Sequence, residues 1–280
     1  MKNKFWIKLI LLWFLLTIIP AFYTMQHSVH YEKTFHNSRL APIIFIPGSS
    51  ATQNRFDDLF QTLNRPKTKH SILKITVTTK GKLQKTGTIA PRDKQPFIVI
   101  AFENNQDGYR NIQKQTRWLN IAMKYLTKNY NFNHFSAVGH SNGGLIWTLY
   151  LEKYFSANSL SINNLITIGT PYNSLESTPN NPTTIFHQLH QNRNKLPNNL
   201  LVYSIAGSTN YQDDGIVPYQ SVEAGKYIFQ KNVKKYTQTT VTGNESNHSS
   251  LLANSEVTKL IRDLLLKNDP NLMDDKSTQN

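Results

Sequence analysis

The sequence predicts an α/β fold with a mostly parallel central sheet and helices on both of its faces. Short, continuous apolar runs recur along the chain, and such runs are typical of strands that are buried on both faces. Segments with helical periodicity lie between several of these runs. Strands that alternate with helices favour a parallel sheet, because each parallel connection has to cross back over the sheet. The expected strands are 42–46, 72–79, 97–102, 135–139, 165–169, 200–206 and 227–229, and the expected helices are 110–129, 144–155 and 255–267.

Residues 1–24 combine a basic start with an apolar run, which is the pattern of an export signal. Lys2 and Lys4 come first, and the apolar run at 5–23 would rise roughly 28 Å as a helix, about the hydrocarbon thickness of a bilayer. No clear cleavage site follows, so we expect an uncleaved signal anchor; cleavage near Ala21, giving a secreted protein, is the alternative. Because the basic residues precede the span, the rest of the chain is expected at the outer cell surface.

A short polar stalk at residues 25–40 and a single domain at residues 41–268 are expected to follow. The domain opens with the apolar run 42–46, which Pro47-Gly48 ends, as expected for a buried strand before a turn. The remaining expected strands are apolar runs of the same kind.

Helical periodicity supports the helices of the domain, most clearly the last one. Within 255–267, Val257, Ile261 and Leu264 fall on one helical face. Residues 172–199 are rich in Asn, Pro, His and Gln, and they predict an irregular excursion above the sheet. Residues 269–280 predict a disordered tail.

Composition narrows the classes of function. The chain has 31 Lys and Arg against 17 Asp and Glu, a net charge of +14, but beyond the N-terminal segment the basic residues are scattered. A scattered basic surface favours plain solvation, or weak attraction to an anionic envelope, over nucleic-acid binding. The absence of cysteine excludes a disulfide framework, a thiolate zinc site and a Cys nucleophile. No motif implies a cofactor or a metal, and the oligomeric state is left open.

The strongest chemical signal is Gly-His-Ser-Asn-Gly-Gly at residues 139–144. It lies at the end of one expected strand and at the start of the next expected helix. A nucleophile in such a strand-to-helix turn needs small residues two positions before and after it, and Gly139 and Gly143 supply them. We therefore predict that Ser141 is a nucleophile.

A serine hydroxyl needs a base and a carboxylate that orients it, in the chain order Ser, acid, His for this type of sheet. His248 lies after the last expected strand and before the last helix, so we predict it as the base. Asp214 follows the penultimate strand and directly precedes a Gly-x-Val-Pro turn, which favours it as the acid, with Asp213 as the competing choice. His187 and His190 come before the acid and lack further metal ligands, so we assign them no role.

The negative oxygen that forms during acyl transfer needs two backbone N–H donors. We expect one from Asn142, directly after the nucleophile, and the other from the loop after the first strand of the domain, at Ser49.

With these residues, the chain resembles the α/β-hydrolase superfamily, and more closely the cell-surface α/β-hydrolases of Gram-positive bacteria, whose function is poorly defined. The resemblance implies lipase-like or esterase-like activity with Ser141 as nucleophile, Asp214 as acid and His248 as base, and with oxyanion donors at Ser49 and Asn142. The chain departs from common relatives in carrying Pro47 where His is usual and Asn142 where many have Met. The segments that carry the resemblance are 42–48, 138–144, 169–172, 214–218 and 248–251.

Three hypotheses of function follow. The first is hydrolysis of carboxylic esters, of a lipid, an envelope polymer or a small molecule, at the outer cell surface. The second is a membrane-tethered binding protein that keeps the scaffold without catalysis. The third is a thioesterase or peptidase that uses the same three residues.

Overall fold

The structure is a computed structural model, and it describes residues 6, 13, 14, 16–21, 23, 39–64, 68–178 and 180–267. The chain divides into two compact units, residues 1–38 and 39–280. The described residues of the first unit are helical. No helix among the described residues is long and apolar enough to cross a membrane. The predicted stalk lies outside the described residues except for positions 39 and 40, and the predicted tail at 269–280 lies outside them entirely.

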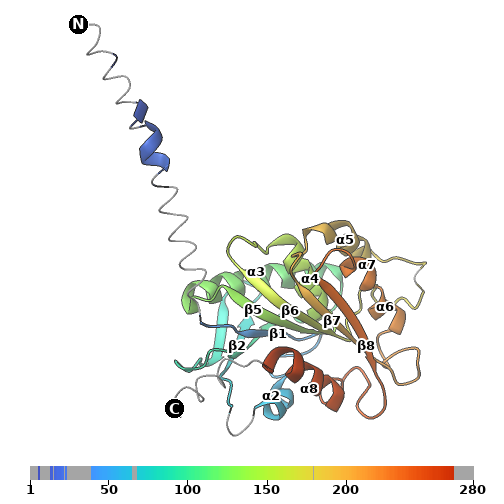
Figure 1. Ribbon diagram of the computed structural model, residues 1–280. Helices are drawn as coiled ribbons and strands as arrows, with labels where there is room; N and C mark the ends of the chain where they lie inside the picture. The colour runs from blue at the N-terminus through green and yellow to red at the C-terminus, as the bar shows by residue number, and fades with distance from the viewer. Residues whose placement is uncertain are drawn as a thin grey trace. The chain divides into compact units, whose positions relative to one another are not determined.

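The second unit is built on one eight-stranded sheet with the order β3-β2-β4-β1-β5-β6-β7-β8 (Figure 1). Every pair of neighbouring strands is parallel except β2 and β3, which are antiparallel. The predicted mostly parallel sheet is therefore confirmed. The strands are β1 (Ile43–Ile46), β2 (Ile72–Val77), β3 (Leu83–Gly87), β4 (Phe97–Phe102), β5 (His134–His140), β6 (Ser161–Ile168), β7 (Leu201–Gly207) and β8 (Lys235–Val241).

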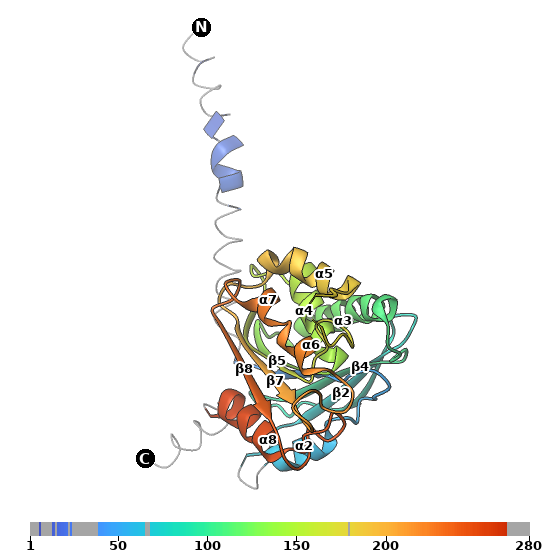
Figure 2. The same cartoon turned by 90° about the vertical axis from the view of Figure 1, so that its right-hand side faces the viewer.

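Helices cover both faces of this sheet, as the sequence predicts. Figures 1 and 2 show α3, α4, α5 and α7 on one face and α2 and α8 on the other. Each face has its own apolar core: on β1, Ile44 packs into the first and Phe45 into the second, because side chains alternate along a strand. The helices are α2 (Asp57–Leu63), α3 (Tyr109–Tyr130), α4 (Asn142–Lys153), α5 (Thr184–Asn192), α6 (Tyr219–Glu223), α7 (Lys226–Phe229) and α8 (Ser255–Ile261), with a 3₁₀ turn η1 (Arg193–Lys195) and a π turn η2 (Arg262–Leu266).

The edges of the sheet differ from the prediction. The prediction of a strand at 227–229 is wrong, because these residues belong to α7. An apolar run of three residues is too short to distinguish a strand from a helical turn. The last strand is instead β8, whose Thr and Gln residues are mostly half exposed at the sheet edge and form no apolar run. β3, at the opposite edge, is missed for the same reason. The excursion expected at 172–199 contains a regular helix, α5.

The parallel arrangement brings the carboxyl ends of the central strands to one edge of the sheet, where open α/β sheets place their ligands. The loops that follow β1, β5, β6, β7 and β8 all leave from this edge. They carry the glycine and proline after β1, the nucleophile candidate after β5, Gly169 after β6, and the acid and base candidates after β7 and β8.

Glu152, on α4, is a buried carboxyl group on the same helix that starts at the nucleophile candidate. It is 4% exposed, and no described residue lies within hydrogen-bond distance of either carboxyl oxygen. Burial raises the pKa of Glu152 to about 9, and the charges of Lys153 and Lys195 oppose this shift only in part. Glu152 is therefore protonated in the folded protein at neutral pH.

This carboxyl group makes stability depend on pH. In the unfolded chain it ionises near its ordinary pKa of 4.5, whereas in the folded protein it stays protonated up to about pH 9. The free energy of unfolding should therefore fall as pH rises between these values. We expect Glu152→Gln to be close to the wild type at pH 5 and to exceed it at pH 8 by on the order of 4 kcal/mol in urea unfolding. The exposed Glu256→Gln is the control, and an unchanged pH dependence in Glu152→Gln would contradict the assignment.

Candidate active site

Ser141 lies at the sharp turn between β5 and α4, with φ 54° and ψ −130°. This is a sparsely populated conformation for a residue with a side chain, and it persists only where the surroundings enforce it. The surrounding glycines allow the turn. A Cβ on Gly143 would lie 2.1 Å from the carbonyl oxygen of Ile46, and one on Gly139 would lie 2.5 Å from the backbone nitrogen of Gly144. The predicted strand-to-helix elbow is thus present at Ser141.

The loop after β1 passes directly beside the serine. A Cβ on Gly48 would lie 2.5 Å from Ser141 Cβ and 3.1 Å from Ser141 Oγ. Only glycine permits this close approach, and the approach brings the following residue, Ser49, next to the nucleophile candidate.

His248 and Asp214 are brought together, with His248 Nδ1 2.7 Å from Asp214 Oδ2. Asp214 is 1% exposed, and its second oxygen, Oδ1, accepts hydrogen bonds from the backbone N–H of Val217 at 2.7 Å and of Ile216 at 3.1 Å. The backbone N–H of His248 donates to the backbone carbonyl of Asp214 at 2.8 Å. Both oxygens of the Asp214 carboxylate are therefore held by contacts. The carboxylate favours the imidazole tautomer of His248 with the proton on Nδ1.

The structure distinguishes the two candidate acids. Asp213 Oδ1 accepts a hydrogen bond from Gly215 N–H at 2.8 Å, and Asp213 makes no contact with His248 among the described interactions. Asp214 is the carboxylate at the imidazole.

Ser141 and His248 line the same cavity, of about 740 Å³. No hydrogen bond joins Ser141 Oγ to His248 in the part of the chain that the structure describes. In enzymes without substrate, such hydrogen bonds are often long and tighten only when the substrate binds. The two side chains therefore lie within one cavity without direct contact among the described hydrogen bonds.

Two residues to which sequence reasoning assigned no role, Gly169 and His140, lie close to the imidazole. A Cβ on Gly169, which has a φ of +56°, would lie 3.1 Å from His248 Nδ1. The ring of His140 lies 4.9 Å from that of His248, and His140 Nε2 is 3.0 Å from the backbone carbonyl of His248. Burial, aided by the neighbouring His248, lowers the pKa of His140 to about 3. His140 is thus a neutral donor that holds the His248 backbone in place.

Arg55 is a further residue of the site that the sequence did not reveal. It lines the same cavity, and its Nη2 donates to the backbone carbonyl of Ser249 at 2.5 Å. Burial lowers the pKa of Arg55, although Asp58 opposes this shift, and the guanidinium stays charged. Arg55 therefore anchors the loop that carries His248.

The two residues expected to supply oxyanion donors, Ser49 and Asn142, line the same cavity as Ser141. The backbone N–H groups of Ser49 and Asn142 have no hydrogen-bond partner among the described residues. The side-chain amide of Asn142 donates to Ser49 Oγ at 2.6 Å and to Asp107 Oδ1 at 2.7 Å. Asp107 Oδ1 also accepts from Gly108 N–H at 2.6 Å. Asn142 thus ties its own helix to the loop after β1 and to the loop between β4 and α3.

The family follows from comparison with known proteins. The family model described as alpha/beta hydrolase of unknown function, DUF915, matches residues 30–268 of this chain. The chain is an α/β-hydrolase of this family. The resemblance stated from the sequence motifs is confirmed, and the family makes the protein a hydrolase while leaving its substrate open. No curated protein matches the chain.

Solved structures agree with this assignment. A structure from Lactobacillus plantarum WCFS1, provisionally described as a cell surface hydrolase, is 52% identical, with a TM-score of 0.75 over 81% of this chain and 92% of that chain. A gene product of Listeria innocua is 29% identical, with a TM-score of 0.75 over 81% of this chain and 94% of that chain. The chain therefore shares its α/β-hydrolase fold with bacterial proteins over most of the length of each.

The histidines of α5 lie apart from the site of this α/β-hydrolase. His190 stacks on Phe186, with ring centroids 5.7 Å apart. Among the described residues, no group of three His, Cys, Asp or Glu side chains is placed to hold a metal ion.

The two hydrogen bonds of the Asn142 side chain in this α/β-hydrolase can be tested by substitution. Asn142→Met keeps the backbone donor but removes both side-chain hydrogen bonds, so the Ser49 loop loses its tie. Two such bonds contribute about 1 to 2 kcal/mol together, and we expect kcat for hydrolysis to fall about tenfold while KM changes little. Asn129→Met, at an exposed position on α3, is the matched control. Equal kcat values for Asn142→Met and the wild type would show that this tie does not support the oxyanion donors.

Proposed function

We propose that this protein hydrolyses carboxylic esters by acyl transfer through Ser141, His248 and Asp214. The observation that carries the proposal is the 2.7 Å contact between His248 Nδ1 and the doubly fixed Asp214 carboxylate, in a cavity that also contains the strained Ser141. A serine in a strained turn that shares a cavity with an oriented imidazole supports nucleophilic catalysis.

In the proposed mechanism, Ser141 Oγ attacks the ester carbonyl while His248 Nε2 takes its proton. Asp214 holds the imidazole and stabilises its charged form without taking the proton itself. The N–H groups of Ser49 and Asn142 donate to the negative oxygen of the tetrahedral intermediate. His248 then protonates the leaving alcohol, and a water molecule, activated in the same way, releases the acid from the acyl-enzyme.

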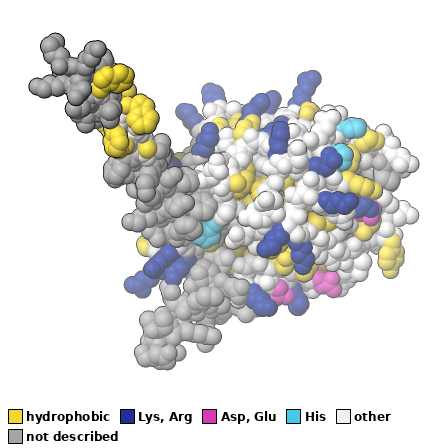
Figure 3. Space-filling model, turned by 45° about the horizontal axis from the view of Figure 1, so that its top comes forward, with side chains coloured by type: hydrophobic (Ala, Val, Ile, Leu, Met, Phe, Trp, Pro, Cys, Tyr) yellow, Lys and Arg dark blue, Asp and Glu magenta, His cyan; other side chains and the backbone are white. Residues whose placement is uncertain are grey.

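We further propose that the hydrolase domain lies at the outer cell surface, held there by residues 1–24 as an uncleaved signal anchor. The basic start followed by an apolar run supports this location. The description of the Lactobacillus relative as a cell surface hydrolase agrees with it. Lys and Arg side chains are spread over the face in Figure 3, which suits weak attraction to an anionic envelope. Protease treatment of intact cells should digest the domain, and protection of the domain would contradict the proposed location.

The experiment that tests the proposed reaction compares an ester, a thioester and an amide of the same acyl group with the full-length chain purified in detergent. We expect turnover of the ester, and its loss in Ser141→Ala. Turnover of the thioester or the amide in preference to the ester would favour the related hydrolase activities. Tight binding of an envelope component that is unaffected by Ser141→Ala, without turnover of any substrate, would favour a binding protein on the hydrolase scaffold.

A further inference from the structure

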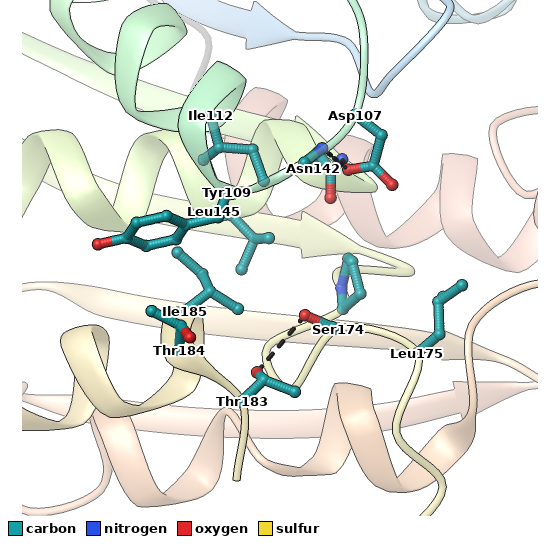
Figure 4. Close-up of a pocket in the computed structure, with 12 residues that line it drawn as sticks. Asp107, Tyr109, Ile112, Asn142, Leu145, Ser174, Leu175, Thr183, Thr184 and Ile185 are labelled. Carbon is teal, nitrogen blue, oxygen red and sulfur yellow. Dashed lines mark hydrogen bonds between the residues drawn. The ribbon is translucent and has the colours of Figure 1, made fainter.

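A second, smaller cavity lies next to the one that contains Ser141. It has a volume of about 250 Å³ and is bounded by α3, by α4 and by the segment that leads into α5 (Figure 4). Figure 4 shows Asp107 and Asn142 at one end and the ring of Tyr109 at the other, with Leu145 between them and Ile185 below the Tyr109 ring. Nothing in the proposed mechanism uses this cavity.

The small cavity adjoins the nucleophile candidate. Four residues line both cavities, and these are Asp107, Asn142, Pro171 and Leu175. Asn142 directly follows Ser141 in the chain and carries one of the proposed oxyanion donors. The small cavity is therefore within reach of a group bonded to the carbonyl carbon under attack.

The walls of the small cavity favour a neutral apolar group. Ile112, Leu145 and Ile185 form its buried side, with exposures of 4%, 1% and 4%. None of the described residues that line it is Lys, Arg or His, and the one charged side chain is the carboxylate of Asp107. An anionic group would be repelled there and would find no cation to pair with.

Hydrogen bonds between two helices lie at the Tyr109 end of the cavity. The phenol of Tyr109 donates to Gln188 Oε1 at 2.8 Å, and the side-chain amide of Gln113 donates to the same oxygen at 2.7 Å. Lys153 in turn donates to Gln113 Oε1 at 2.5 Å. These bonds hold α5, which carries Ile185, against α3, so they fix the position of Ile185 relative to the cavity.

The volume sets the size of that group. A dry cavity of about 150 Å³ holds benzene, with six carbon atoms, so by proportion about 250 Å³ holds about ten non-hydrogen atoms. An acyl chain of about eight carbons fills this space, and a chain of sixteen exceeds its volume.

We propose that this cavity is the acyl-binding subsite and that the substrate is an ester of a short, neutral acyl chain, with Ile185 limiting the chain length. The proposal rests on the proposed ester hydrolysis at Ser141. It favours short-chain esters over esters of long-chain lipids as substrates, whereas the sequence alone allows both.

The first test is the chain-length dependence of kcat/KM for 4-nitrophenyl esters from acetate to hexadecanoate, with the full-length chain in detergent. We expect a maximum at or below the octanoate and at least a tenfold lower value for the hexadecanoate. The half-ester of succinate should react at least tenfold more slowly than the uncharged butyrate. A maximum at the hexadecanoate, a flat profile or a preference for the succinate would overturn the subsite while leaving the proposed reaction intact.

Variants at Ile185 test the limiting wall. Ile185→Trp should lower kcat/KM for the octanoate at least tenfold and leave the acetate nearly unchanged, whereas Ile185→Ala should move the maximum to longer chains. Ile121→Trp, at a site on α3 that is 41% exposed, is the matched control. Equal profiles for all three variants would overturn the role of Ile185.

A binding measurement separates failure of the subsite from failure of the reaction. Titration calorimetry of Ser141→Ala with uncleaved esters needs no turnover, and it should show binding of the octanoate ester that is lost in the double variant with Ile185→Trp. Absence of turnover with this binding intact would refute the proposed reaction alone. Absence of binding would refute the subsite.

Discussion

Ser141→Ala is expected to lower kcat for ester hydrolysis by about 10⁴- to 10⁶-fold, which is the loss seen when a serine nucleophile of this type is removed. The reason is chemical, because no other described hydroxyl is held in the elbow between Gly139 and Gly143. The measurement is steady-state turnover of a short ester by the full-length chain.

The fold of the variant should remain intact. The substitution removes one half-buried oxygen atom and keeps a Cβ in the same backbone conformation, so the thermal midpoint should shift by about 2 °C or less. Wild-type turnover in a correctly folded Ser141→Ala would contradict the nucleophile assignment, whereas a large fall in the thermal midpoint would show that the residue supports the turn as well.

Asp214→Asn is expected to lower kcat by about 10³- to 10⁴-fold. The amide oxygen of Asn can still accept from the N–H groups of Val217 and Ile216, so the turn is retained. The amide NH₂ would then face His248 Nδ1 as a donor. It would favour the tautomer with the proton on Nε2, which cannot accept the proton of Ser141.

Asp213→Asn is the matched control for this prediction, because it makes the same chemical change one residue earlier. In the wild type, the Asp213 carboxylate contacts the backbone of its own turn and not the imidazole of His248. In Asp213→Asn, kcat should therefore stay within about threefold of the wild type. Similar losses in the two variants would mean that the charge of the turn, and not the contact with His248, supports the reaction.

The fold was predictable where burial leaves a clear pattern. The central strands are buried on both faces, so their apolar runs are continuous, as in β4, where every residue is buried. The edge strands β3 and β8 face solvent, and their polar residues leave no such signal. The short helix α7 was mistaken for a strand because three apolar residues carry no period.

The candidate site was predictable to the extent that chain order constrains it. The order of elbow, acid turn and final loop indicated Ser141, Asp214 and His248, and the geometry brings the last two into contact. Asp107 and Arg55 were not predictable, because their roles depend on contacts between loops that are 35 and 194 residues apart in the chain. Such contacts exist only once the sheet has brought the loops together, and no local pattern encodes them.

Labelling of the full-length protein in detergent with a fluorophosphonate probe, followed by mass spectrometry of the modified peptide, tests the nucleophile assignment directly. We expect a single adduct on Ser141, formed at least a hundredfold more slowly in His248→Ala. Absence of an adduct on folded wild-type protein, or equal labelling in His248→Ala, would contradict an activated serine at this site.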